Sequence, residues 1–222
     1  MNLRPILFGS TLLIAGMAAA TAWAWQQIPD GVQLPVHFGI DGKPDGFAPK
    51  AEALLVMPGL AIVLTLLFLV LPKLDPRREN IEASAKFWNA AALTAVALLA
   101  YVHGLLIATA LGQGIDMTSA LLPALSVMFM VLGNYLSKTR ANWFGGIRTP
   151  WTLSSDYAWA RTHRVAGTLY ILSGVVSLAV WAFIGTSAAF IALVGGIVVA
   201  SILSVVLSWV FWRQDPSRVA GG

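Results

Sequence analysis

Cysteine is absent from this chain of 222 residues, and charged residues are scarce. Without cysteine, the chain forms no disulfide, thiolate metal site or iron–sulfur cluster, and it has no cysteine nucleophile. Asp, Glu, Lys and Arg make up 11% of the residues, whereas they make up about 25% of a soluble domain. Hydrophobic residues make up 58%, and the mean hydropathy is +0.76. Because a soluble fold cannot bury such an excess, the composition indicates an integral membrane protein.

Six apolar blocks along the chain are long enough to cross a bilayer as helices. They lie at residues 5–25, 53–71, 87–111, 117–136, 165–184 and 188–212. The sequence therefore predicts an all-α fold, a polytopic membrane protein built as a bundle of six transmembrane helices. Two longer connections, residues 26–52 and 137–164, are the segments with room for a functional site.

The basic residues are distributed unequally between the two sides of this predicted bundle. Twelve of the 14 Lys and Arg residues fall on the side of both termini, and only Lys43 and Lys50 fall on the other side. Lys and Arg near the spans favour the cytoplasmic side. We therefore expect both termini in the cytoplasm (N-in/C-in) and residues 26–52 outside. The pI near 9.7 then reflects this orientation, and we expect no direct binding to nucleic acid.

The first span has an alternative interpretation as a cleaved signal peptide. Arg4 precedes the apolar run, and small residues cluster at positions 18–20. Against this, the apolar run over residues 5–25 is longer than the roughly 7 to 15 residues of a signal-peptide core. Trp25, at the end of the run, suits an interfacial anchor. We favour a retained span, and the other five spans keep their orientation in either case.

The outer connection, residues 26–52, is rich in residues that form tight turns. Gly42, Pro44 and Gly46 supply the backbone angles of such turns, and Asp41 and Asp45 can bond their own backbone. We therefore expect a compact segment.

His37, in the same connection, has three interpretations: a metal ligand, a pH-sensitive contact or a structural residue. A lone His beside Asp is a weak signal for a metal site, so we favour a structural or interfacial role. His163 lies in the other long connection, on the opposite side of the membrane, and the two cannot share a metal ion. We expect neither a metal site nor a cofactor.

Three tryptophans, Trp143, Trp151 and Trp159, lie in the inner connection, residues 137–164. Their amphipathic rings favour the headgroup layer, so we expect this segment to be ordered against the membrane face. Gly145 and Gly146 permit a turn within it.

Helix signals follow this turn. Pro150 disfavours helix at Thr149, Ser154 is the predicted N-cap, and Asp156 is favourable in the first helical turn. The helical period then places four side chains near one face: Asp156, Trp159, His163 and Tyr170.

Arg148 lies between the glycine pair and the run Thr-Pro-Trp, on a constrained backbone near the membrane interface. Its planar guanidinium could bind lipid phosphate, a helix C-terminus or an acidic side chain such as Asp156. The alternative is an ordinary charge that sets orientation. We expect Arg148 to be the charged residue to which function is most sensitive.

A long motif around the inner connection is similar to a known family. It comprises Gly133, Asn134, Tyr135, Lys138, Asn142, Gly146, Ile147, Arg148, Thr149, Pro150, Trp151, Thr152, Leu153, Trp159, Thr162, His163, Arg164 and Gly167. At these residues the chain resembles the SdpI family, bacterial membrane proteins named after immunity to a secreted peptide toxin. The outer residues Pro35, His37, Phe38, Gly42, Pro44, Gly46 and Lys50 resemble the domain of unknown function that often precedes it. Gly145 departs from the family pattern, where a bulkier residue is expected.

The resemblance implies two regions and a location. Residues 1–72 are expected to form an N-terminal two-helix region with the external loop 26–52. Residues 73–222 are expected to form an SdpI-like four-helix region with the cytoplasmic motif loop 137–164. The implied location is the bacterial cytoplasmic (inner) membrane, where the multi-pass chain contacts membrane lipids.

The resemblance also implies a function, resistance to a membrane-active peptide toxin outside and signalling to a cytoplasmic repressor inside. The expected binding or signalling residues of the inner segment are Asn134, Lys138, Asn142, Gly146, Arg148, Thr149, Pro150, Trp151, Thr152, Trp159, His163 and Arg164. Those of the outer segment are His37, Phe38, Gly42, Pro44, Gly46 and Lys50.

Two other functions remain as alternatives. A small-solute transporter or membrane enzyme would need ionisable groups inside the bundle, and the predicted spans contain one histidine, His103, and no charged residue. An isolated His there favours an interhelical hydrogen bond over a proton relay. Nucleotide-binding, nucleophile and zinc-helix motifs are lacking, so we expect no catalytic residue and no enzyme activity. A structural assembly factor is the third alternative.

Overall fold

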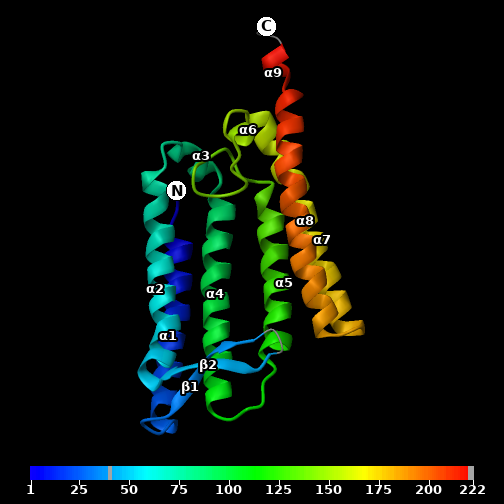
Figure 1. Cartoon of the computed structure of the whole chain (residues 1–222). Coiled ribbons are helices and arrows are strands. Elements are labelled where there is room, and N and C mark those ends of the chain that lie inside the picture. The colour runs from blue at the N-terminus through cyan, green and yellow to red at the C-terminus, as the bar shows by residue number, and fades with distance from the viewer. Residues whose placement is uncertain (40–41, 220–222) are drawn as a thin grey trace.

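The computed structural model describes residues 1–39 and 42–219, and Asp41, a predicted turn residue, lies outside this description. Eleven elements follow one another along the described chain (Figure 1). They are α1 (Arg4–Gln27), β1 (Gln33–Phe38), β2 (Pro44–Pro49), α2 (Lys50–Leu74), α3 (Arg78–Ala83), α4 (Ala85–Ala110), α5 (Met117–Leu136), α6 (Pro150–Leu153), α7 (Asp156–Phe183), α8 (Thr186–Arg213) and α9 (Pro216–Val219).

Six of these helices, α1, α2, α4, α5, α7 and α8, are long and apolar enough to cross a membrane. The predicted all-α polytopic bundle is therefore confirmed. The largest difference in bounds concerns α7, which begins at Asp156, nine residues before the predicted start at residue 165. Ser155, not the predicted Ser154, is its N-cap, and the Ser155 side chain accepts a hydrogen bond from the backbone N–H of Ala158. Hydropathy detects only the apolar part of a helix, so it misses this polar beginning.

The long helices form two groups of three. Helices α1, α2 and α4 pack together, α5, α7 and α8 pack together, and α4 against α5 joins the groups (Figure 1). The predicted boundary between residues 72 and 73 stays a prediction, since α4 contacts helices on both sides of it.

Small residues allow close helix contacts in the second group. A Cβ added to Gly133 of α5 would lie 2.6 Å from the carbonyl oxygen of Gly167 in α7, and the converse distance is 2.5 Å. Further along, Ser126 Oγ donates to Ser177 Oγ at 3.1 Å. Gly196 of α8 lies against Ser173 of α7 in the same way. In lipid, helix association depends on such close packing and on interhelical hydrogen bonds.

His103 lies inside the first group, almost fully buried. Its Nε2 is 2.9 Å from Thr21 Oγ1, and that hydroxyl lies 3.3 Å from the carbonyl oxygen of Leu54. The predicted interhelical hydrogen bond of His103 is thereby confirmed, and it connects α1, α2 and α4.

The outer connection folds as a β-hairpin at one end of the bundle, which we call the hairpin side (Figure 1). Strands β1 and β2 pair antiparallel, with an irregular register around His37. Gly42, in the turn, has a φ of +76°, which favours glycine. A Cβ there would lie 2.7 Å from the Asp116 carboxylate, so the hairpin tip lies against the start of α5. The sequence predicted a compact segment but no strands.

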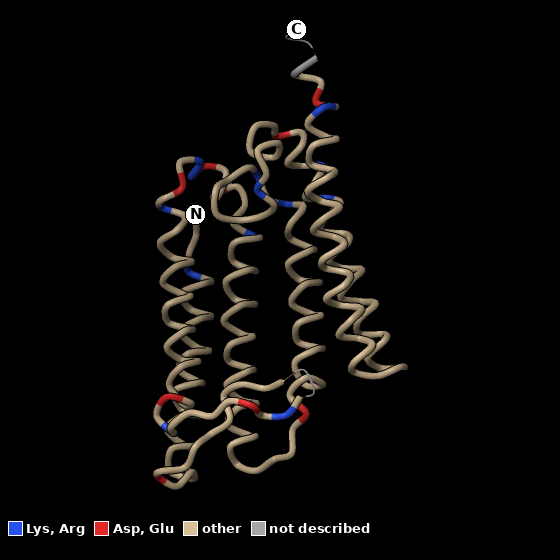
Figure 2. Tube along the Cα trace, viewed as in Figure 1, with Lys and Arg blue, Asp and Glu red and all other residues tan. Residues whose placement is uncertain are grey.

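Charged residues gather at the two ends of the bundle (Figure 2). Lys and Arg concentrate at the end that carries both termini, which we call the basic side, whereas Lys43 and Lys50 belong to the hairpin side. This separation is the pattern on which the predicted orientation rests.

Candidate functional site

The segment between α5 and α7, residues 137–155, folds into a compact structure on the basic side, which we call the cap. Trp159, in the first turns of α7, contacts the cap. Its indole Nε1 donates to the carbonyl and hydroxyl oxygens of Thr139, at 3.1 Å each. The Trp159 ring stacks on His163 with 4.0 Å between ring centroids. Trp159 is therefore buried within the protein, so its ring does not contact lipid headgroups as predicted from the sequence.

His163 joins the cap to α7 through two backbone groups. The Ile147 N–H donates to Nε2 at 2.8 Å, so Nδ1 carries the proton and donates to the Trp159 carbonyl oxygen at 2.8 Å. The ring is therefore neutral and has both nitrogens bonded. Gly146, with a φ of +97°, packs so closely on this ring that a Cβ would overlap His163 Nε2.

Asn142 shapes the turn that precedes Gly146. Its Oδ1 accepts from the backbone N–H groups of Phe144 and Gly145 at 3.0 and 2.6 Å, and its Nδ2 donates to the Arg140 carbonyl at 2.8 Å. A Cβ at Gly145 would lie 3.1 Å from the Phe87 ring. Position 145, where the family pattern predicts a bulkier residue than glycine, is thus a point of close contact between the cap and α4.

Thr149 and Thr152 form a reciprocal capping box at the start of α6. Thr152 Oγ1 also donates to the Ile147 carbonyl oxygen at 2.8 Å. The Thr149 hydroxyl lies 3.0 Å from Ser208 Oγ of α8. The predicted effect of Pro150, to stop a helix at Thr149, agrees with the extended backbone of that residue.

Four polar residues outside the predicted site also hold the cap. Asp75 accepts from the Trp143 N–H at 2.9 Å, Asn80 donates to the Ala141 carbonyl at 2.7 Å, and Ser84 accepts from the Arg140 N–H at 2.8 Å. Asp215, after α8, lies 2.5 Å from Ser155 Oγ. Sequence reasoning missed them, because each bond joins residues more than 50 positions apart. Their one local signal is a polar side chain in the short segments that flank the apolar spans.

The accessible part of the cap is aromatic and basic. Trp143 and Phe144 are exposed, at 46% and 36%. Arg148 is exposed too, and its Nη1 donates to the Trp143 carbonyl oxygen at 2.6 Å. Of the partners considered for Arg148, Asp156 forms no ion pair with it in the described structure, and the guanidinium instead crosses the turn to a backbone carbonyl.

The predicted inner site residues thus divide into two sets. The buried ones, which hold the cap, are Asn142, Thr149, Thr152, Trp159 and His163. The exposed ones are Asn134, Lys138, Arg148, Pro150 and Arg164, whereas Gly146 and Trp151 are half-buried. A hollow of about 350 Å³ opens beside the cap, lined among others by Asn80, Lys138, Thr139, Arg140, Asp156 and Trp159.

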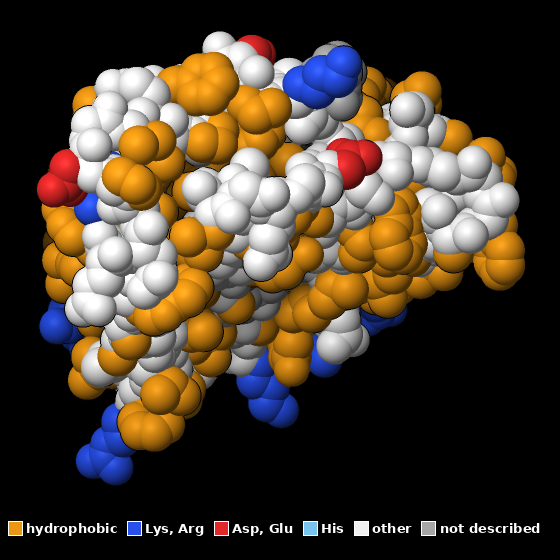
Figure 3. All heavy atoms as spheres, turned by 90° about the horizontal axis from the view of Figure 1, so that it is seen from below, with side chains coloured by type: hydrophobic (Ala, Val, Ile, Leu, Met, Phe, Trp, Pro, Cys, Tyr) orange, Lys and Arg blue, Asp and Glu red, His pale blue; other side chains and the backbone are white. Residues whose placement is uncertain are grey.

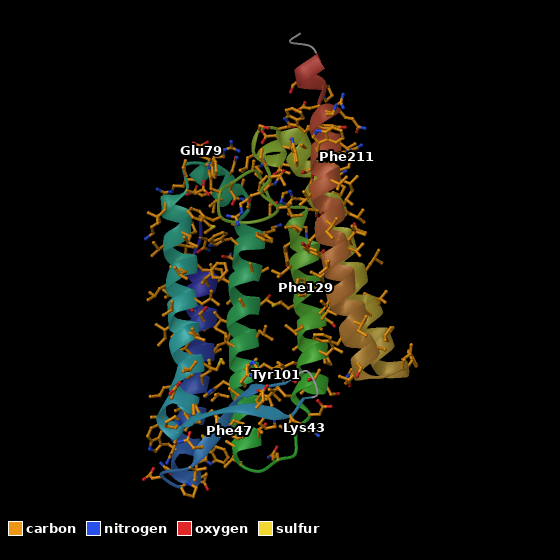
Figure 4. The ribbon with its side chains drawn as sticks, in the orientation of Figure 1. Lys43, Phe47, Glu79, Tyr101, Phe129 and Phe211 are labelled. Carbon is orange, nitrogen blue, oxygen red and sulfur yellow. The ribbon has the colours of Figure 1, made fainter. Side chains whose placement is uncertain are left out.

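Around the cap, cations lie over aromatic rings or beside carboxylates. The Lys138 ammonium is 4.6 Å from the centre of the Tyr135 ring, and the Arg161 guanidinium is 5.4 Å from that of Phe211, labelled in Figure 4. The N-terminal ammonium hydrogen-bonds the exposed Glu82 carboxyl at 3.0 Å, and this bond and its charge lower the pKa of Glu82.

The predicted outer residues act mainly on the hairpin itself. Lys50 is buried, and its ammonium donates to the Ile28 carbonyl at 2.6 Å and to Asp30 at 2.9 Å. His37 Nδ1 lies 2.5 Å from the Asp45 carboxylate on the exposed surface. Gly46 faces His37 so closely that a Cβ would lie 2.9 Å from the His37 Cβ. Pro44 begins β2, and Phe38 ends β1 half-buried.

A metal centre does not emerge from these side chains. Among residues 1–39 and 42–219, no three His, Asp or Glu side chains are grouped so that they could hold a metal ion. The two histidines of the predicted site lie on opposite sides of the bundle, His37 in the hairpin and His163 beneath the cap.

Six membrane-crossing helices, with a hairpin on one side and a cap on the other, define a polytopic α-helical membrane protein. Residues 138–208 match the SdpI/YfhL protein family, and residues 12–62 match a domain of unknown function, DUF1648. The chain is similar to the Immunity protein SdpI of Bacillus subtilis (strain 168), 22% identical over 190 residues that cover 86% of this chain and 87% of the relative. No solved structure matches. The predicted resemblance to the SdpI family is confirmed, and the chain is a multi-pass membrane protein similar to an immunity protein.

Proposed function

We propose that this protein is a bacterial inner-membrane immunity protein that gives resistance to a membrane-active peptide toxin. The observation that carries the proposal is the similarity to an immunity protein over 86% of the chain, which includes both the hairpin and the cap. In this proposal the hairpin side faces outward and meets the peptide, and the basic side faces the cytoplasm.

We further propose that the cap signals to a cytoplasmic repressor. The separation of buried and exposed residues in the cap supports this role. Its buried polar residues fix the backbone, while Trp143, Phe144 and Arg148 remain accessible. Aromatic and Arg side chains are the ones that contribute most to protein interfaces. A rigid frame with an aromatic and basic surface suits the binding of a protein better than the chemistry of a small substrate.

Exposure of cells to membrane-active peptides tests the immunity role. Cells that carry the gene, cells that lack it and cells that express an unrelated six-span protein are treated with the same peptide panel. We expect growth and membrane potential to persist at higher peptide concentrations only in the cells that carry the gene. Equal sensitivity to every peptide would contradict immunity and favour the transporter or assembly alternatives.

Transcript levels after peptide exposure test the signalling role. A relay to a repressor predicts genes that respond to a sublethal peptide dose only when this chain is present. The cap variant Arg148→Lys, at equal membrane abundance, should lose most of this response. A response that is the same without the chain would rule out the relay and leave the immunity role standing.

A further inference from the structure

Two arginines lie on the outer face of α7, near its beginning on the basic side. Arg161 and Arg164 are both exposed, whereas the buried residues Trp159 and His163 lie on the opposite face of the helix. Arg164 directly precedes the apolar block that begins at residue 165, which is the level at which headgroups meet acyl chains. Figure 3, seen from the hairpin side, shows Lys and Arg side chains that project past the apolar flanks of the bundle. The two arginines therefore face the surrounding lipid and not the helix bundle.

Arg161 is held in place by two aromatic rings. The central carbon of its guanidinium lies 5.5 Å from the centre of the Tyr157 ring, one turn earlier in α7. It lies 5.4 Å from the centre of the Phe211 ring, which α8 contributes. Cation–π contacts of this kind leave the N–H groups of a guanidinium available for hydrogen bonds. Contacts with α7 and α8 thus fix the position of the charge without using its donors.

No carboxylate neutralises these two arginines within residues 1–39 and 42–219. In this part of the chain, neither guanidinium forms an ion pair or donates a hydrogen bond. Asp156 instead lines the hollow beside the cap, on another side of α7. Asp215 is buried and bonded to Ser155. Two positive charges, one helical turn apart, are therefore left without a counter-ion among the described residues.

The same face of α7 becomes apolar toward the hairpin side. Thr168 is exposed, and its hydroxyl donates to the Arg164 carbonyl oxygen at 3.1 Å. Leu172 and Val175 follow on this face and are exposed as well. At a rise of 1.5 Å per residue, Thr168 lies about 6 Å and Leu172 about 12 Å from Arg164 along the helix. Cations at headgroup level with apolar side chains beyond them match the phosphate and the acyl chain of a phospholipid.

We propose that this face of α7 binds an anionic phospholipid from the leaflet on the basic side. Arg161 and Arg164 hold the phosphate, because the planar fork of a guanidinium matches two phosphate oxygens. One acyl chain lies along Leu172 and Val175. A zwitterionic lipid carries its own cation beside the phosphate, so it gains less from the two arginines than an anionic lipid does. Such a lipid is a partner beyond the peptide and the repressor, and its binding does not depend on the immunity role.

Photolabelling of the full chain in nanodiscs of phosphatidylcholine tests this site. The probe is phosphatidylglycerol with a photoreactive acyl chain, and labelled positions are mapped by mass spectrometry. We expect labels on α7 near Leu172 and Val175. Unlabelled phosphatidylglycerol should displace the probe, whereas additional phosphatidylcholine and soluble glycerol phosphate should not. Displacement by glycerol phosphate would assign the arginines to free phosphates, and labels spread evenly over all lipid-exposed helices would show no site, so either result would overturn the proposal.

Substitutions on α7 and α8 separate a defined site from general charge attraction. Arg161→Gln and Arg164→Gln should each raise the half-saturating concentration of the probe about fivefold. Phe211→Leu keeps both charges but removes one ring, and should raise this concentration about two- to fivefold.

Arg213→Gln is the matched control for these variants. Arg213 is exposed and lies over Trp209, and it is two residues from Phe211, on the opposite side of α8. Its replacement removes an equal charge and should leave labelling of α7 unchanged. An effect of Arg213→Gln equal to that of Arg161→Gln would mean that net charge alone attracts the lipid, and would overturn the proposal.

Salt provides a measurement that needs no variant. The screening length falls from about 10 Å at 0.1 M ionic strength to about 3 Å at 1 M, so added NaCl should weaken labelling of the wild type by phosphatidylglycerol. Labelling that does not change with salt would show that the arginines do not select the lipid, and would overturn the proposal. Either failure would leave the immunity role standing, whereas absence of protection in cells would contradict that role and leave the lipid site.

Discussion

His163 and Arg148 both bond backbone groups of the cap, yet they differ in what remains available to a partner. His163 is fully buried, and both of its ring nitrogens are occupied. Arg148 is exposed and uses Nη1 for the Trp143 carbonyl, which leaves the other N–H groups of its guanidinium without a hydrogen bond to the described residues. At the scale of single residues, therefore, His163 positions the cap, whereas Arg148 remains accessible, as the proposed signalling role requires.

We expect Arg148→Lys to insert normally but to lose most of the protection or signalling that the wild type provides. A lysine ammonium can replace one hydrogen bond to the Trp143 carbonyl, but it cannot also present a planar fork to a partner. Protection is measured as the peptide concentration that halves growth, at matched membrane levels. The control is Arg78→Lys, an exposed basic residue of α3 outside the predicted site, which should behave as wild type. Full activity of Arg148→Lys would reduce Arg148 to a determinant of orientation.

Gly146→Ala should destabilise the cap. The φ of +97° is unfavourable for alanine, and the new Cβ would overlap the His163 ring that accepts the Ile147 N–H. We expect a loss of about 2 kcal/mol, or a fall in Tm of about 4–8 °C in detergent. Gly195→Ala is the matched control, because no atom lies within 4 Å of a Cβ added there. Equal melting of the two variants would show that Gly146 is not a constrained position.

At the scale of elements, the cap should resist proteolysis. Its backbone is bonded to Asp75 after α2, Asn80 of α3, Ser84 before α4 and His163 of α7. Exposed arginines nevertheless offer cleavage sites at positions 140 and 148 of the cap and at position 161 of α7. Trypsin added to inside-out vesicles should therefore cut slowly in this segment, and faster in the Gly146→Ala variant. Rapid cutting of the wild type at all three sites would mean that the cap is mobile.

The elements also show what the sequence could and could not predict. The six spans were predictable because bilayer thickness dictates the length of apolar blocks. The two strands were not, because Pro35 and the Gly and Pro residues of β2 hide the alternation typical of strands. The hydropathy pattern missed the long polar beginning of α7, although the helix N-cap and first-turn residues at positions 154–156 indicated it.

The candidate site was predictable in its location more than in its contacts. Trp159 and His163 were correctly placed on one helix face, and the structure stacks their rings. The bonds of Asp75 to Trp143 and of Asp215 to Ser155 join distant parts of the chain through single polar groups. No local periodicity encodes such pairs, so they appear only once the helices are packed.

At the scale of the whole molecule, single cysteines in this cysteine-free chain test the orientation. A membrane-impermeant thiol reagent on intact cells should label Gln113→Cys on the hairpin side and spare Arg78→Cys and Ser154→Cys on the basic side. Ser155 is unsuitable, because it is buried and would escape labelling in either orientation. The reverse labelling pattern would invert the predicted topology and contradict the proposed roles of the two sides.

Helix α5 runs from the hairpin side to the cap as one element, and one of its close contacts with α7, Gly133 against Gly167, lies near the cap end. At 1.5 Å per residue, Thr118 is about 22 Å from that contact and Leu136 only about 5 Å. Helix α5 therefore has the proportions of an unequal lever with its fulcrum at Gly133. A sideways push at the hairpin end would reach the cap as a movement about five times smaller and a force about five times larger. Such leverage suits a cap held by short, directional hydrogen bonds, which break under small displacements.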